Sequence, residues 1–185
     1  MLKQDLQKCK KLNFGSGVDY REGYVNMDYG DKNIYNVPIK VDVKHDFRIF
    51  PYPFKNNEFE YIIANHVIEH FCHEDLKKIF KELHRITKEN GIIEIIVPYF
   101  SNFHAVHDPT HKSLFTQGKI KQFYCGLYMP NCFEIIKSDI RLTNSTFRFV
   151  NYFLNISESF KNVYERFFCY WFPAQDIRVI VKVRK

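Results

Sequence analysis

The sequence contains no apolar run of the roughly 18 residues that a membrane-spanning helix needs, and its first residues lack the apolar core of a signal peptide. Its cysteines are few, odd in number at five, and never spaced as C-x-x-C. This excludes a disulfide framework and gives no sign of a thiolate zinc site. We therefore expect a soluble, cytoplasmic protein.

A block of one charge sign is also missing. The 185 residues include 27 Lys and Arg and 21 Asp and Glu, a net charge of +6, but the two signs are interleaved along the chain. This pattern argues against a nucleic-acid partner. The chain does have the composition of a folded globular protein, with 45% apolar and 17% aromatic residues, and its length suits one domain.

Short apolar runs predict a parallel sheet in the first half of the chain. We expect strands over residues 11–14, 24–28, 37–43, 59–64 and 92–97. Before the last of these, an amphipathic helix is expected over 74–90, ended by Gly91. Strand, helix and strand in succession favour a right-handed crossover and an open α/β sheet. Only residues 15–23 join the first two strands, so the usual first helix must be missing or a single turn.

The second half is less regular. Residues 99–118 show no clean periodicity, whereas 133–136 and 140–142 indicate one interrupted strand and 177–183 a final strand.

An aromatic helix is predicted over 160–172, with Ser157 as its N-cap and Pro173 at its end. We interpret its apolar face as packed against the core. The alternatives are an acceptor-pocket wall or a surface in peripheral contact with a membrane, for which Lys161 and Arg166 offer a basic flank.

Candidate ligand-binding residues follow the first three predicted strands. In an open α/β sheet, ligands bind beyond the carboxyl ends of the strands. The first strand ends in Gly15-Ser16-Gly17, where missing side chains let a ligand approach the backbone. Asp28 ends the second strand and Asp46 follows the third. Acids at these places suit a ribose and the edge of an adenine.

Several motifs taken together resemble a known family. LNFGSG at 12–17, YVNMD at 24–28 and NHVIEH at 65–70 look like the small class I S-adenosylmethionine-dependent methyltransferases of the type 11 kind. The resemblance covers residues 11–118. It implies a Rossmann-like, seven-stranded, mostly parallel sheet with an antiparallel C-terminal strand in a three-layer α/β/α arrangement. We expect a single domain over 1–185, with the cofactor-binding core in 11–98 and acceptor-side elements in 99–172.

The resemblance also implies S-adenosylmethionine as cofactor and a role for each motif residue. By the resemblance, Gly15 and Gly17 would face the methionine part of the cofactor. Asp28 would bind the ribose and Asp46 the adenine, and His66 would lie near the transferred methyl group. The family usually has an acid at the position of Asn13, which can still hydrogen-bond the cofactor's amino group but adds no charge.

Three histidines and an acid lie close together in residues 104–111, in the loop that should overlie the carboxyl ends of the strands. A histidine near its ordinary pKa of about 6.5 is a natural general base for the acceptor. We expect His111, Asp108 and His66 to be catalytic, ahead of His104 and His107. The Asp-Pro-Thr-His motif at 108–111 resembles one found in a subgroup of the family. Pinning of the loop is the alternative role.

Metal binding by the same loop is the other alternative, because imidazoles and a carboxylate are ligands for zinc or ferrous iron. No supporting ligand elsewhere is obvious, so no metal is expected. Glu69 and His70 have two alternative roles of equal weight: catalysis, or capping and bracing of the following helix.

The sequence thus predicts methyl transfer from S-adenosylmethionine to a small-molecule or carbohydrate-like (glycan) acceptor. One alternative is a non-catalytic, methyltransferase-like binding or partner subunit, motivated by Asn13 and the missing first helix. A nicotinamide-dependent oxidoreductase is a weaker alternative, because its fingerprint needs a third glycine where Tyr20 stands. The oligomeric state does not follow from the sequence.

Overall fold

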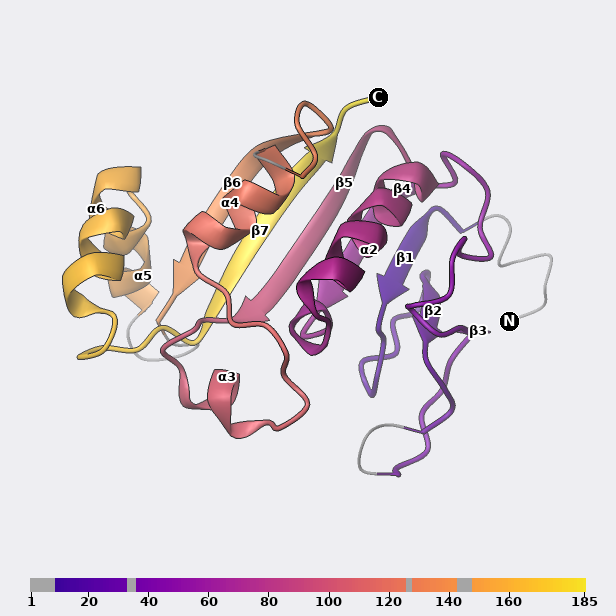
Figure 1. Ribbon diagram of the computed structural model, residues 1–185, viewed down its shortest axis with the longest axis horizontal. Helices are drawn as coiled ribbons and strands as arrows, with labels where there is room; N and C mark the ends of the chain where they lie inside the picture. The colour runs from indigo at the N-terminus through magenta and orange to yellow at the C-terminus, as the bar shows by residue number, and fades with distance from the viewer. Residues whose placement is uncertain (1–8, 33–35, 126–127, 143–147) are drawn as a thin grey trace.

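A computed structural model describes residues 9–32, 36–125, 128–142 and 148–185. Seven strands form one sheet in the order β3-β2-β1-β4-β5-β7-β6 (Figure 1). They are β1 (Lys11–Phe14), β2 (Val25–Asp28), β3 (Val43–Lys44), β4 (Phe59–Asn65), β5 (Thr87–Pro98), β6 (Phe133–Arg141) and β7 (Asp176–Val183). All neighbours pair in parallel except β7, which is antiparallel to β5 and β6. The predicted mostly parallel sheet with an antiparallel last strand is confirmed.

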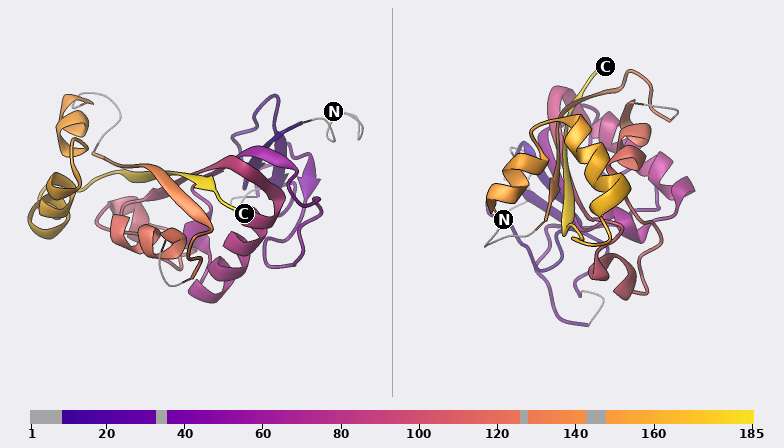
Figure 2. Two further views of the ribbon diagram at one scale, coloured as in Figure 1. Left: turned by 90° about the horizontal axis from the view of Figure 1, so that it is seen from above. Right: turned by 90° about the vertical axis from the view of Figure 1, so that its left-hand side faces the viewer.

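The helices are α2 (His73–Ile86), α3 (Phe103–His107), α4 (Gln117–Cys125), α5 (Arg148–Leu154) and α6 (Glu158–Val163), with a short 3₁₀ turn η1 (Ile68–His70) and a π-helical turn η2 (Tyr164–Phe168). Helices α2 and α4 lie on the same face of the sheet (Figure 2). No helix joins β1 to β2, as predicted, and none is described between β2 and β3. Within the described residues, the second helical layer is therefore reduced beside β1 to β3.

The core lies between the sheet and α2 and α4. Alternate residues of the neighbouring strands β5 and β7 are buried there: Ile93, Ile95 and Val97 in β5, and Ile177, Val179, Val181 and Val183 in β7. Helix α2 adds the predicted stripe of Leu76, Ile79, Phe80, Leu83 and Ile86, all buried. Each such side chain contributes about 1.5–3 kcal/mol when buried. This core fixes the strands whose carboxyl ends carry the candidate residues.

Two sequence-predicted boundaries are wrong. The helix expected over 74–90 ends at Ile86, because Thr87 turns extended and its hydroxyl donates to the Leu83 carbonyl at 2.6 Å. Gly91 lies inside β5 and does not end the helix. A Cβ on Gly91 would lie 2.6 Å from Thr87 Cγ2, so the glycine permits a close approach within the strand. The strand expected over 37–43 is limited to β3, a two-residue edge strand.

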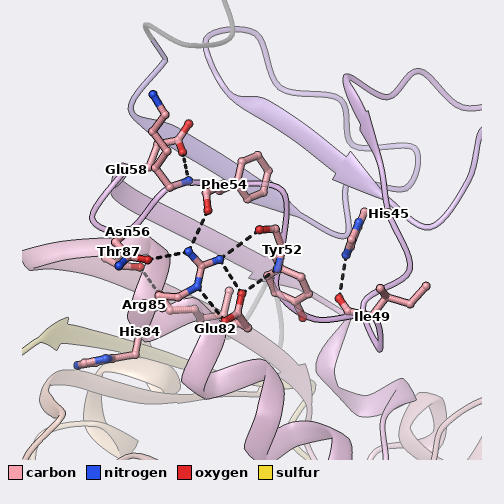
Figure 3. Close-up of polar contacts among 12 residues, drawn as sticks. His45, Ile49, Tyr52, Phe54, Asn56, Glu58, Glu82, His84, Arg85 and Thr87 are labelled. Carbon is pink, nitrogen blue, oxygen red and sulfur yellow. Dashed lines mark hydrogen bonds and ion pairs between the residues drawn. The ribbon is translucent and has the colours of Figure 1, made fainter.

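A polar network anchors the loop before β4 to the end of α2 (Figure 3). Arg85 donates from Nε and one terminal nitrogen to both carboxylate oxygens of Glu82, at 2.8 and 2.7 Å. Its remaining N–H groups donate to the carbonyls of Tyr52 and Phe54 and to Oδ1 of Asn56, at 3.1, 2.9 and 2.8 Å. All five guanidinium donors are therefore used.

The aromatic helix predicted over 160–172 forms only as far as Phe168, because residues 169–172 lie in a turn, so Pro173 does not end it. Its apolar face does not pack against the core. The helix consists of α6 and η2, and Ser157 Oγ accepts from the N–H of Phe160 at 3.3 Å as the expected cap. Of the seven residues on its apolar face only Tyr164 is buried. The other six, here called the aromatic surface, are 46–81% exposed: Phe160, Val163, Phe167, Phe168, Trp171 and Phe172.

The aromatic surface is exposed because α5 and α6 lie beyond the β6 end of the sheet, where no second layer formed by the described residues covers them (Figure 2). The interpretation of a core-facing helix is therefore wrong. None of the described helices is long and apolar enough to cross a bilayer.

Candidate functional site

The glycine turn after β1 lies across the carboxyl ends of β1, β2 and β4. Gly15 has a φ of +71°, and a Cβ there would be 2.3 Å from Cγ2 of Val67, so only glycine fits. The N–H groups of Gly15 and Ser16 both donate to the carbonyl of Met27, at 2.9 and 3.0 Å. The turn is thereby fixed at the place predicted for a cofactor.

Asp28 is joined to this turn. Its Oδ2 accepts from the N–H of Gly17 at 2.7 Å, and its Oδ1 accepts from the N–H of Tyr29 at 2.7 Å. Each carboxylate oxygen has a second lone pair. The carboxylate can therefore accept further hydrogen bonds from a diol such as ribose.

Asp46 lies in the loop after β3, as predicted, and pairs with Arg48. Its Oδ1 accepts from the backbone N–H and from Nε of Arg48, at 2.9 and 3.2 Å. These hydrogen bonds, the backbone one first, hold the pKa of Asp46 below its ordinary value.

Asn13 is buried beneath the turn, with 1% of its surface exposed. Its amide nitrogen donates to the carbonyl of Asp19 at 2.7 Å and to Oδ1 of Asn26 at 3.0 Å. Both amide protons are thus used within the protein, and they pin the turn. A contact between Asn13 and a cofactor stays a prediction.

His66 follows β4 in a left-handed conformation, with a φ of +54°. Its Nδ1 is 3.2 Å from Oε1 of Glu69, and its Nε2 is 3.4 Å from Oδ1 of Asp176. Burial disfavours the charged imidazolium, but the hydrogen bond to Glu69 and the charges of both carboxylates outweigh burial and raise the pKa of His66. Burial also raises the pKa of Asp176, against the opposing effects of His66 and Arg141.

The Asp-Pro-Thr-His loop folds onto the segment that follows β4. The N–H groups of Lys112 and Ser113 donate to the carbonyl of Glu69, at 2.8 and 3.0 Å. This brings Nε2 of His111 to 4.0 Å from Oε1 of Glu69 and 4.0 Å from Oδ2 of Asp108. The structure therefore brings the three predicted catalytic residues, His66, Asp108 and His111, around Glu69.

His70 belongs to the same group of side chains. Its ring centroid is 4.7 Å from that of His111, and its Nδ1 is 2.9 Å from Oγ1 of Thr110. Burial is the main cause of the lowered pKa of His70. Neither His70 nor Glu69 caps α2, whose N-cap is Cys72; the Cys72 thiol donates to Oδ2 of Asp75 at 3.2 Å and accepts from no helix N–H. We call Glu69, His70 and His111, with their neighbours His66 and Asp108, the histidine cluster.

The other two histidines of the loop lie outside this cluster. His104 and His107 are exposed on α3, where the His107 ring stacks on Phe103 with centroids 4.5 Å apart.

Three buried side-chain atoms among the described residues have no hydrogen-bond partner: Ser16 Oγ, Glu69 Oε2 and Arg141 Nε. They belong to the turn after β1, the segment after β4 and the end of β6, so all three lie at the carboxyl edge of the parallel strands. Buried polar atoms are normally paired, and unpaired ones at one edge indicate a ligand site. Ser16 Oγ, together with the side-chain-free cradle at Gly15, fits a nucleoside cofactor lying over the turn.

Sequence reasoning missed Asp176 and Arg141, whose side chains pair at 3.0 Å. Asp176 begins β7, and an antiparallel last strand starts where its parallel neighbours end. That rule could have placed Asp176 at the site before the structure was known.

The comparisons with known proteins agree with this geometry. Residues 7–95 match the model of the methyltransferase domain family. No curated protein matches the sequence of this chain.

Solved structures share the fold along nearly the whole chain. A SAM-dependent methyltransferase from Archaeoglobus fulgidus is 20% identical with a TM-score of 0.63, and the match covers 97% of this chain and 88% of that one. A chain of the Haloferax volcanii complex between a methyltransferase activator and a methyltransferase is 14% identical with a TM-score of 0.56, covering 95% and 82%. The Bacillus subtilis protein YcgJ is 13% identical with a TM-score of 0.55, covering 95% and 91%. At these identities the likeness shows the fold alone.

Proposed function

We propose that this chain is a methyltransferase that binds S-adenosylmethionine over the glycine turn and transfers its methyl group to a small-molecule or carbohydrate-like acceptor. The observation that carries the proposal is the 2.7 Å hydrogen bond from the N–H of Gly17 to Asp28. It lies in a turn where position 15 accepts only glycine. It supports a preformed site for a ribose beside an open backbone. The sulfonium supplies an activated methyl donor, so the chain's main task is positioning.

The binding roles follow from this placement. The backbone of Gly15 and Gly17 would meet the methionine part, Asp28 would accept the ribose hydroxyls and Asp46 would accept from the adenine amino group. Asp46 would have to share its carboxylate with Arg48 or exchange that partner.

An oxygen or nitrogen acceptor usually has to lose a proton during transfer. Among the predicted catalytic residues, His66 has the most accessible side chain, 44% exposed against 10% for His111. Two carboxylates, Glu69 and Asp176, flank its ring and would stabilise the imidazolium formed after it takes a proton. These facts favour His66 as the general base, with Asp108 and His111 holding the loop and the acceptor.

An open surface hollow beside the end of β5 offers room for a small acceptor. It has a volume of about 580 Å³, which lies within the range of small-molecule sites. Its lining combines apolar rings with charged and polar groups: Phe100, Thr116, Asn162, Val163, Glu165, Arg166 and Phe167. Such a mixture suits a ligand with both flat faces and hydroxyl groups, as in a sugar.

Calorimetric titration with S-adenosylhomocysteine and S-adenosylmethionine tests the cofactor, with NAD as the control ligand. We expect saturable binding of the two sulfur nucleosides and none of NAD. Asp28→Ala should weaken binding about 10- to 100-fold, the loss expected when hydrogen bonds to a charged group disappear. Asp28→Asn keeps an acceptor for the Gly17 N–H, and it separates loss of the turn from loss of the ribose contact.

The matched control is Asp31→Ala, three residues further along. Asp31 is exposed and pairs with Lys44 on the surface, so its loss should leave nucleoside binding unchanged. Equal weakening by Asp31→Ala, or NAD binding that Asp28→Ala abolishes, would contradict the proposed site. A screen of small hydroxylated and sugar acceptors with labelled methyl donor then tests transfer itself.

A further inference from the structure

We infer that Glu69, His70 and His111 form a binding site for a divalent transition-metal ion. One ligand atom from each of these side chains, a carboxylate oxygen and two imidazole nitrogens, lies within 4.8 Å of the other two. Ligands of a tetrahedral zinc ion, with bonds of about 2.0–2.2 Å, are roughly 3.4 Å apart. Small side-chain rotations would therefore close the site around an ion.

The hydrogen bond of His111 prepares its other nitrogen for a metal. Nδ1 of His111 is 3.1 Å from the carbonyl oxygen of Ala105, which can only accept, so Nδ1 carries the proton. Nε2 is left with a free lone pair, and it faces Glu69 and Asp108 at 4.0 Å from each. A metal-bound histidine characteristically donates its second N–H to a carbonyl or carboxylate in this way.

The tautomer of His70 follows in the same way, from which atom carries each proton of its hydrogen bonds. Thr110 has a single hydroxyl proton, which it donates to Oδ1 of Asp108 at 2.6 Å. Its oxygen must therefore accept from Nδ1 of His70, at 2.9 Å. Nε2 of His70 is then also unprotonated. In their neutral forms both histidines therefore keep Nε2 free to bind a metal.

Glu69 supplies the independent sign that something binds here. Its side chain is 99% buried, since only 1% is exposed, yet Oε2 has no hydrogen-bond partner. Leaving a buried carboxylate oxygen unpaired is costly, and a cation in the cluster would satisfy it. Oδ2 of Asp108 lies close enough to His111 to serve as a fourth ligand or to neutralise the ion.

The donor set indicates the class of ion. Two imidazoles with one or two carboxylates suit Zn²⁺ or Fe²⁺, whereas Mg²⁺ and Ca²⁺ prefer oxygen ligands alone. With Glu69, His70 and His111 as its only protein ligands, a four-coordinate ion keeps one coordination position open. Holding an acceptor oxygen in that position would rest on the proposed function; binding of the ion itself would not.

The sequence could not join these ligands because they come from two motifs. His111 belongs to the loop after β5, and Glu69 and His70 to the turn after β4. Only the folding of that loop onto η1 brings them together.

Titration of the chelator-treated chain with ZnCl₂ tests the site. We expect one Zn²⁺ per chain by calorimetry, no heat with MgCl₂, and a visible absorption band when CoCl₂ replaces ZnCl₂. Glu69→Gln and His111→Ala should each weaken Zn²⁺ binding about 100-fold or more, because each removes a direct ligand. His107→Ala is the matched control, since this exposed histidine of the same region lies outside the cluster.

Two results would overturn the site: Zn²⁺ binding that Glu69→Gln and His111→Ala leave unchanged, or an equal loss with His107→Ala. Circular dichroism and thermal melting without metal show that the variants fold, and Glu69→Gln keeps the side-chain shape if His111→Ala does not. S-adenosylhomocysteine titrated in parallel separates the two proposals. Its binding should survive the ligand variants, whereas its absence in the unmodified chain counts against the proposed function and leaves the metal site standing.

Discussion

The polar groups at the two ends of the sheet's strands differ in how completely they are hydrogen-bonded. Where β4 and β5 begin, all five N–H groups of Arg85 have acceptors, and Glu82 also accepts from the N–H of Tyr52 at 2.8 Å (Figure 3). At the carboxyl edge, Ser16, Glu69 and Arg141 each keep a buried atom without a partner. The first edge is built for stability, and the second keeps unpaired groups that a ligand can satisfy.

The aromatic surface presents a third situation. Its six side chains are 46–81% exposed, so they bury little apolar area and contribute little to the stability of α6 and η2. Four tests, in order of expected effect, address these differences.

Gly15→Ala should have the largest effect. The new methyl group would lie 2.3 Å from Val67, in a backbone with a φ of +71°. Strain and overpacking together predict a loss of about 4 kcal/mol in the free energy of unfolding. Gly23→Ala is the control, because φ is +78° there but nothing lies within 4 Å, so its loss should be about 1 kcal/mol. Similar urea midpoints for the two variants would show that the turn does not pack tightly against Val67.

Arg85→Ala should come next, with a loss of about 3 kcal/mol. It leaves the largely buried carboxylate of Glu82 and the carbonyls of Tyr52 and Phe54 without their donor. Thermal and urea unfolding would measure the loss. Lys88→Ala, which removes an exposed pair with Glu60, should cost less than about 0.5 kcal/mol. A small effect of Arg85→Ala would remove the contrast between the two edges.

Ser16→Ala should act in the opposite direction on stability. Removing a buried hydroxyl that has no partner is expected to raise the free energy of unfolding by up to about 1 kcal/mol. The same change should weaken S-adenosylhomocysteine binding if that hydroxyl meets the cofactor. Calorimetry and urea unfolding of one preparation measure both effects, and a loss of stability would show that the hydroxyl is already satisfied.

The smallest effect is expected from the aromatic surface. Trp171→Ser and Phe172→Ser change residues that are 81% and 63% exposed, so the free energy of unfolding should move by less than about 0.5 kcal/mol. Binding of a hydrophobic dye should fall at the same time. Tyr164→Phe is the buried comparison: it loses the hydroxyl bond to the Phe172 carbonyl at 2.7 Å and about 1 kcal/mol. A larger loss for Trp171→Ser would mean that this surface is packed in solution.

Local sequence signals determined most of the sheet and the glycine turn. An apolar run such as the one in Phe59–Asn65 predicts a strand from its own residues alone. Gly15 and Asp28 are predicted as site residues because ligands bind at the carboxyl ends of strands in an α/β sheet. The same local signals misplaced the end of α2, because the close approach at Gly91 depends on the neighbouring Thr87 and on β4.

Only the tertiary structure decided the rest. The seven-residue face of the aromatic helix has the period of a buried stripe, but burial depends on whether a second layer covers it, and here none does among the described residues. The histidine cluster likewise depends on the loop after β5 folding back onto η1, and Asp176 on the direction of the last strand. The sequence by itself determined most of the candidate residues, because residue type and strand ends are local. Their meeting around Glu69 was decided by long-range packing, which no local pattern encodes.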